Sequence, residues 1–149
     1  IETFQAALDV CDRPLPQTSY TAKFSLQYCA NIALSDGVVN FESFNESKRT
    51  RLSEASANTS VTATPEYSDV YPERWGATVR VTSPSGDVIT AIRQDCKGDP
   101  QSPLSPQEIE LKAKMVLNNA TSPERSKNLI SQIRSLIDAE KMPSFPLSD

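Results

Sequence analysis

The segment from Trp75 to Arg93, "WGATVRVTSPSGDVITAIR", limits the fold more than any other part of the 149-residue chain. Apolar and polar residues alternate up to Val81, "SPSGD" provides a turn, and "VITAIR" follows as a second extended run. Alternation on both sides of a glycine-containing turn is typical of a β-hairpin with one half-buried face. The chain is therefore expected to contain an antiparallel sheet, with Trp75 anchoring the hairpin in the core or at a domain junction.

Helical patterns flank this hairpin. The clearest helix start is Ser105 to Glu108, a capping box with proline in the first turn, and Ser122-Pro123 opens a further helix whose apolar stripe reaches Ile137. Before the hairpin we expect a helix from about Asn45 to Ala57, anchored by Leu52, and a short strand over residues 60–64. Helices around a small, mostly antiparallel sheet describe an α+β fold, here as one domain over residues 1–149.

The first ten residues fit two patterns. Alternation favours a strand, whereas a spacing of three and four residues between apolar positions also fits a helical stripe. The alternating set is Phe4, Ala6, Leu8 and Val10, and the helical set is Ile1, Phe4, Leu8 and Cys11. We predict a strand for this segment.

A long helix is predicted for "AKFSLQYCANIALSDG", opening near Tyr20 after Thr18 or Ser19 as N-cap and ending at Gly37. On a helical wheel its apolar residues form two separate faces. Between them Lys23, Gln27 and Asn31 form a polar strip at a spacing of four residues. This strip either hydrogen-bonds nearby backbone and reaches solvent, or it faces a partner domain or a ligand.

Composition excludes several kinds of chemistry. The chain has no histidine, so it cannot by itself provide a histidine general base, a Ser-His or Cys-His nucleophile, or a histidine-bearing zinc site. A net charge of -4 argues against a nucleic-acid partner, and the apolar runs are too short to cross a membrane. The basic run "KRTR" at Lys48 to Arg51 is interpreted as a solvated helix face.

Three cysteines, Cys11, Cys29 and Cys96, cannot all pair within one chain and favour free, buried thiols in a reducing compartment. No targeting segment is recognisable, so we expect a cytoplasmic location, or the mitochondrial matrix in a eukaryote. The start at Ile1 without a methionine leads us to expect a piece of a longer protein.

Four stretches carry a family resemblance: "AKFSLQY", "ALSDG", "YPERWGATVRVTSPSG" and "KGDPQSPLSPQEIELK". In this order they resemble the carboxy-terminal part of the MmgE/PrpD family, which includes 2-methylcitrate dehydratase, cis-aconitate decarboxylase and iminodisuccinate epimerase. The resemblance implies the smaller α+β domain of a two-domain fold, with the larger helical domain absent. It implies a cofactor-free lyase or isomerase that acts on a small di- or tricarboxylate in a cleft between the domains, and a homodimer.

The resemblance also suggests site residues. Lys23 would contribute positive charge to the binding of substrate carboxylates, Gln27 and Tyr28 would donate hydrogen bonds, and Lys97 in the "KGDP" loop is a further candidate. No catalytic residue, metal or cofactor is assigned to this chain, and the isolated chain is expected to be inactive. The alternative is a module that uses the same fold for binding or dimerisation without catalysis.

Overall fold

The computed structural model describes residues 1–136. Its contacts separate two compact units, residues 1–102 and the residues from Pro103 on. One domain over residues 1–149 stays a prediction. None of the helices within residues 1–136 has the length and apolar character needed to cross a bilayer.

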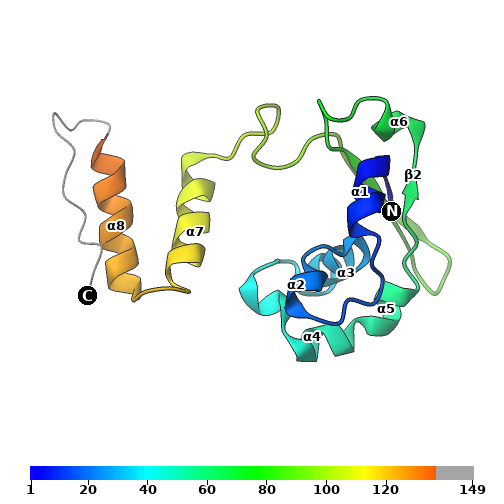
Figure 1. Cartoon of the computed structure of the whole chain (residues 1–149), viewed down its shortest axis with the longest axis horizontal. Coiled ribbons are helices and arrows are strands. Elements are labelled where there is room, and N and C mark those ends of the chain that lie inside the picture. The colour runs from blue at the N-terminus through cyan, green and yellow to red at the C-terminus, as the bar shows by residue number, and fades with distance from the viewer. Residues whose placement is uncertain (137–149) are drawn as a thin grey trace. The chain divides into compact units, whose positions relative to one another are not determined.

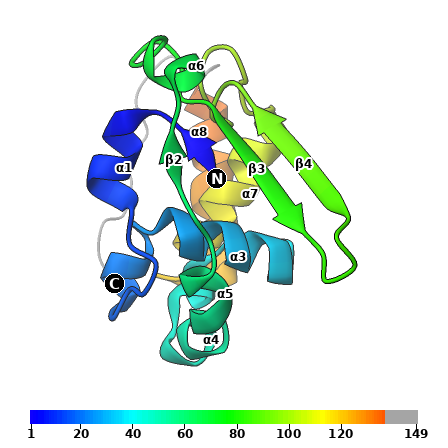
Figure 2. The same ribbon diagram turned by 90° about the vertical axis from the view of Figure 1, so that its right-hand side faces the viewer.

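The first unit contains a four-stranded sheet in the order β2-β1-β3-β4 (Figure 2). Strand β1 (Glu2–Thr3) pairs in parallel with β2 (Thr62–Ala63) and antiparallel with β3 (Ala77–Thr82), which pairs antiparallel with β4 (Val88–Arg93). The predicted hairpin and the α+β class are confirmed, with one parallel strand pair that makes the sheet mixed.

Short helices flank this sheet (Figure 1). They are α1 (Gln5–Cys11), α2 (Ser19–Ala22), α3 (Leu26–Asp36), the 3-10 helix η1 (Phe41–Phe44), α4 (Glu46–Arg51), α5 (Ser53–Ala57) and α6 (Pro65–Ser68). The main apolar cluster lies among the helices and contains Ala22, Tyr28, Ile32 and Leu52, with Phe44 packed against it. The single helix predicted from about Asn45 to Ala57 is wrong, because the segment forms two helices, α4 and α5, that meet at Leu52. Leu52 is buried, as predicted for the anchor of this segment.

The strand prediction for the first ten residues is wrong beyond Thr3. Only two residues form a strand, β1, which lies between β2 and β3 in the sheet, and α1 begins at Gln5. The helical stripe explains the burial pattern, because Leu8 and Cys11 are partly buried while Asp9 and Val10 are exposed. Phe4 ends the extended segment as a buried side chain stacked on Tyr71, with ring centroids 4.6 Å apart.

The hairpin is exposed more than its alternation predicts. In β3 the buried residue is Thr78, whose hydroxyl lies 2.5 Å from the hydroxyl of the buried Tyr67. All six residues of β4 are exposed. Trp75 is 50% exposed and packs edge-on against Phe4 at 5.6 Å between ring centroids.

Up to residue 136, the second unit contains two helices, α7 (Pro106–Leu117) and α8 (Pro123–Ser135). The predicted capping box is confirmed, because the Ser105 hydroxyl accepts from the Glu108 amide while the Glu108 carboxylate accepts from the Ser105 amide. Within α8, Ser126 and Ile130 are buried. Ile137 lies outside the described residues.

Candidate functional site

The predicted helix from Tyr20 to Gly37 is two helices, and the break falls at Lys23. Helix α2 ends at Ala22, and Ser25 caps the start of α3 by accepting a hydrogen bond from the Tyr28 amide at 3.0 Å. The Ser25 hydroxyl also donates to the Arg13 carbonyl at 2.6 Å. Because α3 begins after Lys23, the prediction that Lys23, Gln27 and Asn31 form one strip along a single helix is wrong. The predicted ends are confirmed: Thr18 caps α2, and Gly37 has φ 71° after α3.

Gln27 and Asn31 do share α3, and both amides have protein partners. The buried Gln27 donates through Nε2 to Asp12 Oδ1 at 2.5 Å and accepts from the Arg13 amide at 3.2 Å. Asn31 donates through Nδ2 to the Gln27 carbonyl and to Thr59 Oγ1, both at 2.9 Å. These bonds tie the 12–13 loop and the end of α5 to α3. A role for Gln27 in substrate binding stays a prediction.

Lys23 is exposed and lies over the ring of Phe44, with Nζ 5.9 Å from the ring centroid. A cation over an aromatic face is attracted by the ring quadrupole and keeps its outer side in solvent. No carboxylate of residues 1–136 forms an ion pair with this ammonium group. Its charge is therefore available to an anionic ligand.

Tyr28 lies behind Phe44, with ring centroids 6.1 Å apart. The side chain is buried, and its hydroxyl donates to the Ser43 carbonyl. Burial raises the pKa of Tyr28, partly opposed by the positive charges of Arg49 and Arg51. The phenol is thus a neutral hydrogen-bond donor that already has a backbone acceptor.

Arg49 completes the surroundings of Phe44, and the sequence interpretation missed it. Its Nη1 donates to the Phe44 carbonyl at 2.6 Å and to Ser19 Oγ at 3.1 Å, and its Nη2 donates to the Gln17 carbonyl at 3.4 Å. All three acceptors are uncharged, and within the described chain no carboxylate pairs with Arg49. Phe44 thus contacts two positive charges, Lys23 at its ring and Arg49 at its backbone carbonyl.

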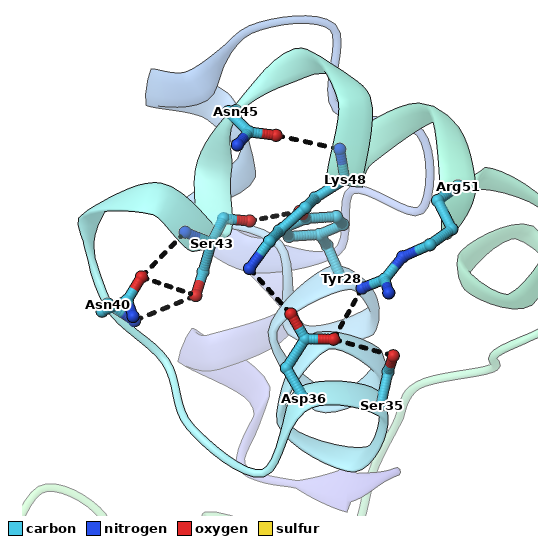
Figure 3. A network of polar contacts seen from close by, with 8 residues as sticks. All are labelled: Tyr28, Ser35, Asp36, Asn40, Ser43, Asn45, Lys48 and Arg51. Carbon is cyan, nitrogen blue, oxygen red and sulfur yellow. Dashed lines mark hydrogen bonds and ion pairs between the residues drawn. The ribbon is translucent and has the colours of Figure 1, made fainter.

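The other two cations of the "KRTR" run are neutralised (Figure 3). Lys48 Nζ lies 2.8 Å from Asp36 Oδ2, and Arg51 Nη2 lies 2.6 Å from Asp36 Oδ1. Arg51 is exposed, as the solvated helix face predicted, whereas Lys48 is partly buried. Hydrogen bonds from Lys48 and Arg51 hold the pKa of Asp36 well below its usual range. Helical spacing explains why Lys48 and Arg51 pair with Asp36 while Arg49 does not. Residues 48 and 51 are three positions apart and share a face of α4, whereas residue 49 lies on another face.

A cavity of about 250 Å³ opens beside Arg49. The loop from Pro14 to Gln17 forms one wall, and Tyr28, Ser53 and Ser56 line it from the helices. The Ser56 hydroxyl is fully buried and has no hydrogen-bond partner among the described residues. No sequence pattern singles out Ser56, because its burial depends on the packing of α5 against α3.

Lys97 lies in the loop that follows β4 and is exposed. The acidic residues of this loop have partners. Asp95 forms two bonds to Arg74, at 2.8 and 2.5 Å, which lower the pKa of Asp95, and Asp99 accepts from the Cys96 amide at 3.2 Å. Lys23 and Tyr28 thus meet around Phe44, whereas Gln27 points towards the 12–13 loop and Lys97 follows the sheet.

The cysteines are free thiols, as predicted, but none is fully buried: Cys11 and Cys29 are partly buried and Cys96 is exposed. Burial raises the pKa of the Cys29 thiol, which disfavours the nucleophilic thiolate. Within residues 1–136, no three side chains of the metal-binding types are grouped closely enough to hold an ion. The predicted absence of a metal and of a cofactor stays a prediction.

The family model described as the MmgE/PrpD C-terminal domain matches residues 1–137. No curated protein matches the chain.

Proposed function

The chain belongs to the MmgE/PrpD family, whose C-terminal domain it contains, and from this membership we propose that it is part of a cofactor-independent lyase or isomerase. Its substrate would be a small di- or tricarboxylate, as for a 2-methylcitrate dehydratase. The observation that supports this proposal is that two cations contact Phe44, the exposed Lys23 at its ring and the partly buried Arg49 at its backbone carbonyl, and that no described carboxylate neutralises either.

The proposed reaction requires positive charge at this place. Removal of a proton next to a carboxylate creates an enolate-like anion in addition to the carboxylates that the substrate already has. Fixed cations lower the energy of that charge when they are in position before the reaction begins. Phe44 holds the Lys23 ammonium by a cation–π contact, and Arg49 is fixed by hydrogen bonds to Phe44, Ser19 and Gln17.

The acid and base groups would come from elsewhere. Membership of the family implies an amino-terminal domain as a partner, and we place the active site between that domain and the surface around Phe44. The chain has no histidine, so a histidine base would belong to the partner domain. A homodimer, and a cytoplasmic or mitochondrial location, are further parts of this proposal.

Substitution of Lys23 tests the proposal in the protein that contains both domains. Lys23→Ala is expected to lower kcat/KM for a tricarboxylate by about 100-fold, the effect of losing one preorganised charge-stabilising donor. Lys23→Arg should restore part of the rate because it keeps the charge. Since Lys23 is exposed, the midpoint of urea unfolding should change little.

Lys112→Ala is the matched control, because Lys112 is an exposed lysine on α7 with no ion pair to a described residue. It should leave kcat/KM unchanged. Turnover by Lys23→Ala at the rate of Lys112→Ala would refute the role of Lys23. No turnover of any di- or tricarboxylate by the intact wild-type protein would favour a module for binding or dimerisation, the alternative that the exposed strand β4 supports.

A further inference from the structure

Strand β4 is an edge strand without protection. It is the last strand in the sheet order, so the backbone groups on its outer edge have no partner strand among the described residues. Its apolar side chains are exposed as well, with Ile89 at 72%, and Val88 and Ile92 at 57% each. Natural edge strands are usually blunted by lysine, proline, a bulge or a covering segment. Residues 88–93 contain neither lysine nor proline, and they pair with β3 in unbroken register.

We propose that a second copy of this chain pairs with β4, antiparallel and about a two-fold axis through Thr90, so that two four-stranded sheets become one. The proposal deepens the homodimer of the proposed function by naming its contact surface. It does not depend on catalysis, because its tests measure association alone.

Charge selects this register. A two-fold axis perpendicular to the sheet must pass through a residue position, because directly opposed residues have to lie on the same face. With the axis at Thr90, Asp87 of each copy lies opposite Arg93 of the other. Neither side chain has an ion-pair partner within residues 1–136, where Asp87 accepts a hydrogen bond from Ser85. Two such cross-strand pairs stabilise the dimer.

Apolar pairing selects the same register. The axis at Thr90 places Val88 opposite Ile92 and Ile89 opposite Ala91, so every exposed apolar residue of β4 meets another. The axis one position later, at Ala91, would oppose Asp87 to Asp95 and Ile89 to Arg93. The axis at Ile89 would leave Arg93 opposite Ser85 and Val88 opposite Thr90. Both alternative axes lose the ion pairs between Asp87 and Arg93. The axis at Ala91 also adds a repulsion between Asp87 and Asp95.

A second apolar surface continues into this contact. A groove of about 600 Å³ runs between the sheet and α3, with Val79, Val81, Ile89 and Ala91 on the sheet side and Leu34 on α3. When the two sheets pair, Ile89 of one copy lies next to Ala91 of the other copy. It thereby lengthens the apolar wall of that copy's groove. The contact therefore includes this face of both sheets in addition to the strand edges.

Disulfide trapping tests the axis. In a Cys96→Ser background, Thr90→Cys should give a disulfide-linked dimer on mild oxidation, because the two Thr90 Cα atoms would lie about 4.5–5.5 Å apart. Thr82→Cys is the matched control: Thr82 is also an exposed threonine and lies on the same sheet face, but it belongs to the inner strand β3. It should give no linked dimer. If the protein forms a dimer in solution but Thr90→Cys gives no disulfide-linked dimer, β4 is not the contact surface. The homodimer itself would still stand.

Charge reversal tests the register. Arg93→Asp should raise the dissociation constant measured by sedimentation equilibrium by about 10-fold, since it replaces two attractive pairs by two repulsive ones. The double variant Asp87→Arg with Arg93→Asp should return the constant close to the wild-type value. We expect a dimer Kd of about 1 µM, so the proposal is wrong if the complete wild-type protein stays monomeric at about 100 µM. It is also wrong if the double variant has a dissociation constant as high as that of Arg93→Asp alone.

Discussion

Gly76 shows how a single residue depends on distant parts of the chain. A Cβ atom at this position would lie 2.7 Å from both Cδ1 and Cε1 of Tyr67 and 3.1 Å from the Arg93 carbonyl oxygen. Tyr67 cannot move away easily, because its ring is fully buried and its hydroxyl contacts Thr78. Glycine is required here by close approach, whereas Gly37 is required by its positive φ of 71°.

Gly76→Ala is therefore expected to lower the free energy of unfolding by about 1–3 kcal/mol, the usual cost of overpacking. Urea unfolding measures this loss. In a Tyr67→Val background the same glycine substitution should cost much less, since the ring that it would strike is gone. Equal losses with and without the ring would contradict the overpacking explanation.

At the scale of elements, the junction of α3 and α4 depends on one carboxylate. Asp36 ends α3 and binds both Lys48 and Arg51 of α4, and its own side chain is only 16% exposed (Figure 3). A carboxyl whose pKa is lowered by folding adds stability above the pKa of the unfolded chain, near 3.9. That stability is lost as the pH falls from there towards the lower pKa of the folded state.

Asp36→Asn should thus unfold at lower urea than wild type at pH 7, and the difference should begin to shrink below about pH 4. High salt at pH 7 should reduce the difference, because Arg51 is half exposed and its charge is screened. Glu42→Gln, at an exposed carboxylate without an ion pair to a described residue, serves as the control and should track wild type. A gap between Asp36→Asn and wild type that stays constant from pH 7 to pH 2.5 would rule out the ionic origin.

The whole molecule divides into two compact units, and the surface around Phe44 belongs to the first. Lys23 and Arg49 on this surface are available to bind an anionic ligand, but the chain has no histidine to serve as a base. The expected division of labour is that this part binds and stabilises charge, and that the partner domain moves the proton.

Residues 1–149 alone should therefore show no measurable turnover of tricarboxylates. The complete protein is the reference, and the measurement is steady-state kinetics with both at the same concentration. Turnover by the isolated chain within about 10-fold of the complete protein would mean that its own residues supply the base, against the proposed role.

The local sequence determined the elements that depend on neighbouring residues. The hairpin turn, the capping box at Ser105, the N-cap at Thr18 and the end of α3 at Gly37 were all predictable, because each is stabilised by hydrogen bonds or dihedral preferences within a few residues. The same local terms led to the α+β class.

Tertiary contacts decided the rest. Next to the break at Lys23, the Ser25 hydroxyl donates to the Arg13 carbonyl, a contact across twelve positions that a helical wheel does not contain. Arg49 joins the candidate site because Phe44 and the loop near Gln17 fold around it, and β4 is exposed because it ends the sheet order. Periodicity reports which side chains share a face, while the identity of the group that meets each face depends on residues far away in the chain.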